Sequence, residues 1–401
     1  MLSLASQVSG LLQLAALLWR HGPSNATDAY FYLFNLGNLP TQILIVGVLY
    51  PMLLSQDRVT RKGSERFGLW VPVSALAAVG VGAAWLAAQG RVSEDLVPIL
   101  GLAALNAVVQ ARLWYLAVAA EADGVPHWVA AIALPANALA TLVVAFPWPS
   151  STATVTAMLA ALAAANTAFL VIFVRRRVGR TVIEGLPAAP ARAHVAHWWF
   201  LTKSFVGYGG LMVVQSLALV LPPSTLTLLT LPMKIVGSVS ATFVNAVMPL
   251  IVHQNTESPI AARRFLRILG GIIGAVSLFG SAGGIVFFPD YGLHFVAVGL
   301  WLVASASASV SQRMMFRFLP PSASRITIVV VPLIVAAVAL SIQSEGFGLL
   351  ALLCAYALVD AASGFLVLLS LGDRLMAIVT GLISLGLVTI WVFSLMHPEL
   401  A

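Results

Sequence analysis

The chain has 401 residues, of which 60% are hydrophobic and only 9% are charged, with a net charge of +7. A soluble domain carries about 25% charged residues, so this composition excludes a soluble globular enzyme. It also excludes intrinsic disorder, which requires low hydrophobicity and high charge. The apolar runs are continuous and about 20 residues long, which is the length of a membrane-spanning helix and unlike the alternating strands of a β-barrel. The composition therefore predicts an all-α polytopic membrane protein.

Thirteen apolar runs, separated by polar or Pro/Gly-rich breaks, predict thirteen spans. In chain order they lie near residues 3–20, 29–54, 68–89, 96–120, 125–146, 152–174, 199–221, 226–252, 266–287, 293–312, 326–342, 347–371 and 375–396. The first run lacks a basic start, and another apolar run follows within ten residues. We therefore expect it to be a span and not a cleaved leader.

Lys and Arg residues are concentrated in the loops that follow even-numbered spans. These loops hold sixteen, whereas only Arg20 and Arg91 lie at the opposite ends. Cytoplasmic loops of membrane proteins are enriched in Lys and Arg. We therefore expect a cytoplasmic N-terminus and an external C-terminus. The positive charge is assigned to these loops and not to a nucleic-acid partner.

An internal repeat relates the two halves of the chain. An offset of 198 residues places the first six predicted spans on the second six, and matches Thr27 with Thr225 and Pro51 with Pro249. Because six is even, both halves would insert in the same orientation, as parallel repeats do in transporters. The predicted organisation is a lobe at 1–174, a basic cytoplasmic linker at 175–198, a second lobe at 199–372, and an accessory helix with a short tail at 373–401.

Motifs of enzymes and nucleotide-binding proteins are absent. There is no GxSxG, HExxH or P-loop sequence, and the seven histidines are scattered. No loop is long enough to form a nucleotide-binding domain. We therefore expect neither an enzyme nor a resident cofactor or metal. The single cysteine, Cys354, excludes an intrachain disulfide.

Polar and charged residues inside the spans are the candidates for function, because burying them in a bilayer is costly. Lys234 and Asp360 lie well inside spans 8 and 12, and a mutual ion pair is the structural alternative for both. The uncharged candidates for a polar cavity between the lobes are Gln13, Asn38, Gln42, Gln215 and Asn245. Pro40 and Gly47 interrupt span 2, as Pro232 and Gly237 do span 8, so bent helices are predicted at equivalent places.

Two segments resemble a known family. Residues 22–55, GPSNATDAYFYLFNLGNLPTQILIVGVLYPMLLS, and 231–252, LPMKIVGSVSATFVNAVMPLIV, are similar to MurJ/MviN-type lipid II flippases of the multidrug/oligosaccharidyl-lipid/polysaccharide (MOP) exporter superfamily. The resemblance implies two six-helix lobes around a central cavity in the bacterial plasma membrane. Asp28, Gly47 and Pro51 stand at the family's motif positions, so Asp28 is a substrate-binding candidate.

The chain also departs from this family. Gln7 and Gln13 stand where the family has cavity arginines in span 1, and Thr41 and Gln42 stand where it has adjacent arginines in span 2. Lys234 is the remaining cation at cavity depth. Since arginine is the better bidentate partner of a diphosphate, the headgroup carried could differ from that of lipid II.

The resulting hypothesis is a flippase that moves lipid II or another undecaprenyl-linked saccharide from the inner to the outer leaflet by alternating access. Lys234 would hold the phosphate and Asp360 the coupling cation, Na⁺ or H⁺. Two alternatives remain open. One is a cation-coupled small-molecule or drug antiporter of the same fold, and the other is a non-transporting scaffold whose partners are cell-wall synthesis proteins.

Overall fold

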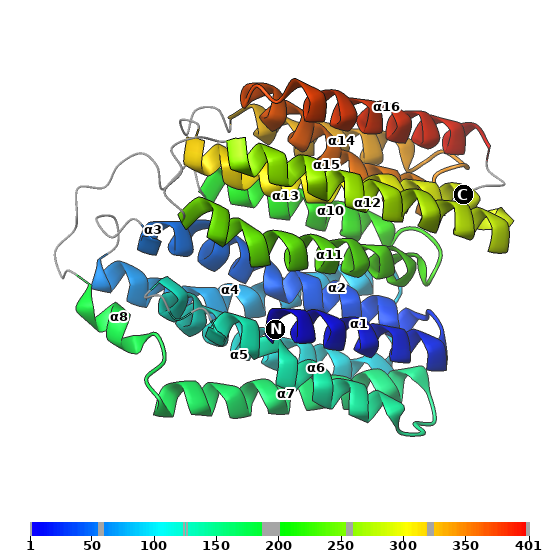
Figure 1. Cartoon of the computed structure of the whole chain (residues 1–401). Coiled ribbons are helices and arrows are strands. Elements are labelled where there is room, and N and C mark those ends of the chain that lie inside the picture. The colour runs from blue at the N-terminus through cyan, green and yellow to red at the C-terminus, as the bar shows by residue number, and fades with distance from the viewer. Residues whose placement is uncertain are drawn as a thin grey trace. The chain divides into compact units, whose positions relative to one another are not determined.

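A computed structural model describes residues 2–54, 60–122, 125, 127–186, 201–253, 260–318 and 325–397 (Figure 1). The side chains of a few helical residues, among them 241–253, lie outside the description. All regular structure in the described residues is helical, and nine of its helices are long and apolar enough to cross a membrane. These helices indicate a multi-pass membrane protein.

Each of the thirteen predicted spans coincides with helical structure to within a few residues. Two of the helices are shorter apolar segments, Thr225–Ser240 and Ile328–Ser341, when only the described residues are considered. The all-helical class is thus confirmed. The pairing of the helices into two six-helix repeats around a cavity stays a prediction.

By its internal contacts the chain divides into two compact units, Met1–Thr227 and Leu228–Ala401. The first contains the first six predicted spans together with the seventh. The boundaries of the predicted lobes come from the sequence repeat and not from the internal contacts that define the two units. They therefore stay predictions. Residues 187–198 of the predicted linker lie outside the described residues.

The first unit is built around a central helix, α5. Its elements are α1 (Leu2–His21), α2 (Asn25–Pro40), η1 (Thr41–Leu49), α3 (Tyr50–Leu54), α4 (Arg61–Ala88), η3 (Glu94–Leu96), α5 (Val97–Ala122), α6 (His127–Ala145), α7 (Ser151–Arg175), α8 (Arg180–Gly185), η4 (Phe205–Gly209) and α10 (Gly210–Ala218). Helix α5 packs against α2, α4 and α7, while α1 packs against α6. The carboxamides of Asn166 and Asn106 form a buried hydrogen bond of 2.8 Å between α7 and α5.

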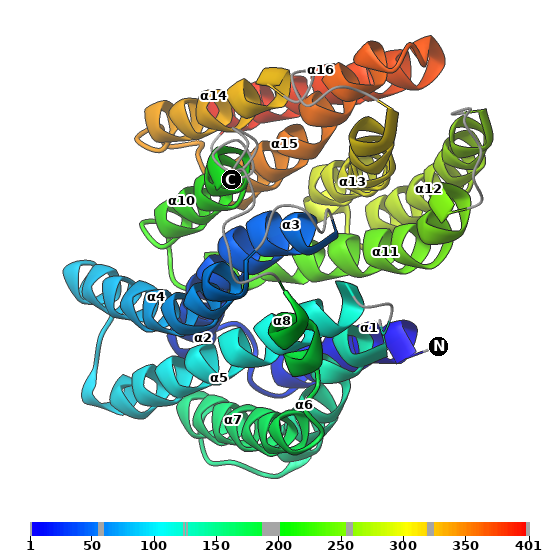
Figure 2. The ribbon, with the colours of Figure 1, turned by 90° about the vertical axis from the view of Figure 1, so that its left-hand side faces the viewer.

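The second unit surrounds α15. Its elements are α11 (Thr225–His253), which begins at the boundary, α12 (Ile260–Phe287), η5 (Pro289–Tyr291), α13 (Gly292–Phe318), α14 (Arg325–Ser341), α15 (Leu349–Ser370) and α16 (Arg374–Met396). Helix α15 lies between α13 on one side and α14 and α16 on the other (Figure 2). Residues 350–359 of α15 are all buried, which makes it the core of this unit.

Span 2 changes its helical form at Pro40. The side chain of Ser24 accepts a hydrogen bond from the amide of Thr27 and so caps the start of α2. After Pro40 the chain continues as the π-helix η1 and then as α3. A proline cannot donate the usual backbone hydrogen bond, and wider π-turns accommodate such interruptions. The predicted irregularity of span 2 therefore takes the form of a nine-residue π-helix.

Span 8 does not repeat this change. Helix α11 is α-helical throughout Thr225–His253, including Pro232 and Gly237. In the second half of the chain the described π-helical segment is η4, in span 7. The backbone hydrogen bonding thus does not show the predicted match between spans 2 and 8.

Candidate functional site

Asp28 lies at the centre of a hydrogen-bond network in the first unit. Its side chain is 1% exposed. One carboxylate oxygen accepts bonds from the backbone amide of Ser224 at 2.7 Å and from the Arg91 guanidinium at 3.2 Å. The other accepts bonds from the amide and the hydroxyl of Thr227, at 2.8 and 2.6 Å. Arg91 also donates to the backbone carbonyl of Leu221.

This network joins three segments that are far apart in the sequence. Asp28 is in the first turn of α2, Arg91 is in the loop after α4, and Thr227 is in the first turn of α11. The first amides of a helix lack backbone partners and favour a negative charge. Asp28 therefore caps α11, and Arg91 neutralises it. The donors described around Asp28 belong to the chain itself, and its predicted role in substrate binding stays a prediction.

A second group of polar contacts, here called the seam, joins α2 to α10. The side-chain amide of Asn35 donates to Gln215 at 3.0 Å, and the hydroxyls of Tyr32 and Ser216 are 2.9 Å apart. The indole of Trp85 donates to the carbonyl of Ser216 at 3.1 Å. The structure thus brings the predicted site residue Gln215 against α2.

The other uncharged candidates do not join this seam through the described contacts. Gln13 is buried, 3.4 Å from the Tyr30 hydroxyl and 3.1 Å from the Met158 sulfur. Asn38 donates to the carbonyl of Phe34 in its own helix, and Gln42 is half-buried in η1. The side chain of Asn245 lies outside the described residues.

Asp360 lies in the middle of α15 in the second unit. The indole Nε1 of Trp301, on α13, donates to its carboxylate at 3.0 Å. The Trp301 ring also packs against Tyr356, with ring centroids 5.7 Å apart. Ser305 follows Trp301 by one turn on α13, and its hydroxyl is 3.1 Å from that of Ser240 on α11. Asp360 is half-buried, and Trp301, Ser305 and Ser240 form a polar cluster beside it.

Asp360 lies far from both ends of its helix. Asp360 lies eleven residues after Leu349 and ten before Ser370, so it is about 15 Å from either end of α15 at 1.5 Å per residue. Carboxylates at such depth in membrane helices mark ion pathways and proton relays. A carboxylate in this position can be neutralised reversibly by a proton or a cation.

Lys234 lies on α11 and is exposed. The ion pairs formed between described residues do not include one between Lys234 and Asp360. The mutual pair considered from the sequence as the structural alternative is therefore absent from the described contacts. The roles of Lys234 and Asp360 in binding stay predictions.

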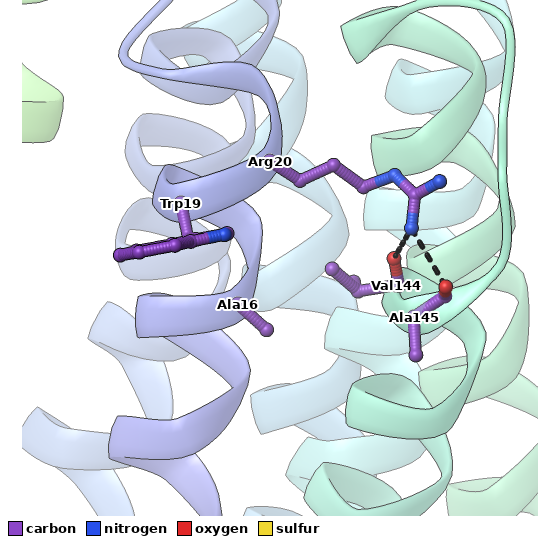
Figure 3. Close-up of a pocket in the computed structure, with 5 residues that line it drawn as sticks. All are labelled: Ala16, Trp19, Arg20, Val144 and Ala145. Atoms are coloured by element: carbon purple, nitrogen blue, oxygen red, sulfur yellow. Dashed lines mark hydrogen bonds between the residues drawn. The ribbon is translucent and has the colours of Figure 1, made fainter.

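A shallow hollow lies between α1 and α6 (Figure 3). It is lined by Ala16, Trp19, Arg20, Val144 and Ala145. Arg20 donates to the carbonyl of Ala145 at 2.6 Å and thereby caps the end of α6, while Trp19 is 94% exposed. Because the cation already binds the helix end, this hollow is not the site we favour.

Sequence reasoning missed the partners of both aspartates. Arg91 was notable only as one of two cations at the predicted outer ends, and nothing in the sequence links it to Asp28. Nothing in the sequence links Trp301 to Asp360. Among the described residues, no three side chains of metal-binding type come together.

Comparisons with protein-family models, curated proteins and solved structures give no match to this chain.

Proposed function

We propose that the chain is a membrane transporter that moves a polyprenyl-linked cell-envelope precursor from the inner to the outer leaflet. The observation that supports transport most directly is the position of Asp360. A carboxylate at mid-helix, bonded to Trp301, is costly in a bilayer, and such residues mark ion or proton pathways. Such a group is expected in a cation-coupled transporter and has no evident use in a purely structural helix.

The substrate class rests on the resemblance of residues 22–55 and 231–252 to lipid II flippases. A lipid-linked saccharide has a charged diphosphate and an apolar tail, so its headgroup needs a polar path while the tail stays in lipid. Lys234 supplies a cation on α11 for the phosphate. The precursor is lipid II or another undecaprenyl-linked saccharide.

In the proposed cycle, Asp360 exchanges its cation, Na⁺ or H⁺, as the helices alternate between two arrangements. Neutralising the carboxylate lowers the cost of holding it in an apolar bundle. The occupied and empty forms of the Trp301–Asp360 contact would then favour different packings of α13 and α15. The two lobes predicted from the sequence repeat would rock around the headgroup path.

The test is depletion of the protein followed by mass spectrometry of lipid-linked intermediates. We expect one undecaprenyl-linked species to accumulate and to return to its original level on complementation with the intact chain. Asp360→Asn should be produced and inserted normally but should fail to complement. Glu345→Gln, which neutralises an exposed acid in the loop before α15, is the matched control and should complement. An unchanged set of lipid-linked intermediates would contradict the proposal.

A scaffold for cell-wall synthesis proteins is the second candidate. It is favoured by the internal pairing of Gln215, which is predicted to line a cavity, with Asn35. In a scaffold these contacts would simply hold the helices together. Full complementation by both Asp360→Asn and Lys234→Gln would support this alternative, because a scaffold needs neither group for ion or phosphate binding.

A further inference from the structure

Arg112 is the basis of a separate inference, which does not depend on the proposed function. It lies on the exposed stripe of α5 that also carries Pro98, Gly101 and Leu105. The other members of this stripe are apolar or lack a side chain, as expected for a surface that faces lipid. An arginine on such a surface needs a compensating anion or access to water.

The structure holds this guanidinium in a fixed position. Its Nη1 donates to the carbonyl of Gly68 on α4 at 2.9 Å, and its Cζ lies 5.1 Å from the centre of the Tyr115 ring. The Tyr115 hydroxyl is in turn 3.3 Å from that of Ser64. A Cβ atom at position 68 would lie 2.6 Å from the Arg112 guanidinium. The absence of a side chain at Gly68 therefore makes the notch that receives Arg112.

Arg112 has no carboxylate partner among the described residues. The nearest acid along α4, Glu65, pairs with Arg61 at 2.9 Å. The hydrogen bond described for Arg112 uses Nη1, and its other N–H donors take part in none of the described hydrogen bonds. They are available to an anion that approaches from the exposed side of α4 and α5.

The notch lies near one end of α4, towards the boundary between hydrocarbon and headgroups. Helix α4 has 28 residues and is about 42 Å long, whereas the hydrocarbon core of a bilayer is about 30 Å thick. Gly68 lies seven residues after Arg61, about 10 Å from the start of the helix. With the excess length of about 12 Å divided equally between the two ends, Gly68 lies about 4 Å inside the hydrocarbon edge. This is close enough for the guanidinium and a lipid phosphate to meet.

Further cations surround the same end of the first unit. Helix α8 packs against α4 and α5 (Figure 2). It is anchored by the buried side chain of Ile183, and Glu184 on it interacts electrostatically with Arg61. Eight basic residues lie at this end, against Glu65, Glu121 and Glu184: Arg61, Lys62, Arg66, Arg112, Arg175, Arg176, Arg177 and Arg180. The local charge is strongly positive beside exposed apolar side chains of α4 such as Leu69 and Leu76.

We propose that this notch binds the headgroup of an anionic phospholipid of the surrounding bilayer. Arg112 binds the phosphate through its remaining donors, since a guanidinium is well suited to a planar pair of bonds to phosphate oxygens. The cations of α4 and α8 add long-range attraction. The acyl chains lie along the apolar face of α4 and α5.

The test measures the thermal unfolding midpoint of the purified full-length chain in detergent, with added phosphatidylglycerol or phosphatidylcholine. We expect phosphatidylglycerol to raise the midpoint more than phosphatidylcholine does, and high salt to reduce the difference. Arg112→Gln should remove at least half of this difference, and Arg112→Lys should retain more of it. Arg264→Gln, which removes an exposed cation from α12, is the matched control and should leave the difference unchanged.

Arg61→Gln/Arg180→Gln provides a second variant that leaves the Arg112–Gly68 bond in place. It should weaken the lipid effect even if Arg112→Gln fails to fold. An equal response to both lipids would overturn the proposal, as would an equal loss in Arg112→Gln and Arg264→Gln. Stabilisation by inorganic phosphate in phosphatidylcholine that matches the effect of phosphatidylglycerol would reveal a free-anion site and overturn the assignment to lipid.

Discussion

Asp28 is buried and Asp360 is half-buried, and the two aspartates have different surroundings. Asp28 accepts four hydrogen bonds from Arg91, Ser224 and Thr227. Its charge is therefore compensated by the chain alone. Asp360 lies at mid-helix with the neutral donor Trp301, so its charge is not cancelled by an ion pair among the described residues. A bound cation or proton would complete its surroundings.

The contacts of Asp28 predict a large effect on stability. Asp28→Asn removes the charge that pairs with Arg91 and weakens the cap of α11. Breaking a buried ion pair on one side costs about 3 kcal/mol or more, so the thermal unfolding midpoint in detergent should fall clearly. Asp95→Asn, the same change at an exposed position near Arg91, should change the free energy of unfolding by less than about 0.5 kcal/mol.

A different outcome would favour the role implied by the family resemblance. If Asp28→Asn is as stable as Asp95→Asn but abolishes export, then Asp28 binds substrate and its capping contacts are secondary.

At the residue scale, the sequence identified charged positions but not their partners. Asp360 and Lys234 are conspicuous because charges are rare in apolar runs. Their contacts could not be predicted, since Trp301 lies 59 residues from Asp360 and Arg91 lies 63 from Asp28. Such pairs depend on how the helices pack, which local patterns do not encode.

At the scale of single elements, two π-helical segments of the first unit pack against each other. These are η1 in span 2 and η4 in span 7. Gly47 in η1 lies so close to Ser204, just before η4, that a Cβ atom would overlap the serine side chain. Segments of π-helix often occur at functional positions. The close approach of Gly47 to Ser204 shows that η1 and the residues before η4 fit each other tightly at this point.

The close approach at Gly47 predicts a specific rescue. Gly47→Ala should destabilise the protein by about 1–3 kcal/mol, because overpacking forces backbone or side-chain shifts. Ser204→Gly in the same chain should restore most of the thermal stability by making room for the methyl group. Gly80→Ala is the control, because no atom lies within 4 Å of its added Cβ, and it should be neutral or slightly stabilising. Equal stability of Gly47→Ala and Gly80→Ala would show that the contact is not tight.

Element positions were more predictable than element form. Apolar runs located the helices because a bilayer requires about 20 apolar residues per span. Pro40 indicated an interruption but not a π-helix, since a proline is compatible with several local adjustments. Pro232 shows this directly, because α11 continues through it as an α-helix.

At the scale of the whole molecule, charge distribution is the main source of information on orientation. The sixteen-to-two division of Lys and Arg between the loops predicts which ends face the cytoplasm. The helices of the structure agree with the predicted spans, but the direction of insertion and the repeat-based lobes stay predictions. Both concern the membrane or the relation of the two halves, which the contacts within each unit do not determine.

Cysteine labelling tests the orientation. In a Cys354→Ala background, which removes a buried cysteine, single cysteines replace the exposed residues Pro149 and Arg180. An impermeant thiol reagent should label position 149 in intact cells and position 180 only after permeabilisation. Labelling of position 180 but not of position 149 in intact cells would reverse the orientation.

The most direct test of the central claim is the leaflet in which the accumulated precursor resides. After depletion of the protein, intact spheroplasts are treated with an impermeant hydrolase that cleaves lipid-linked saccharides, and the protected fraction is measured by mass spectrometry. A transporter from the inner to the outer leaflet predicts that the accumulated species is protected and becomes accessible when the intact chain, but not Asp360→Asn, is restored. A lipid-linked pool that is equally accessible with and without the protein would contradict the account.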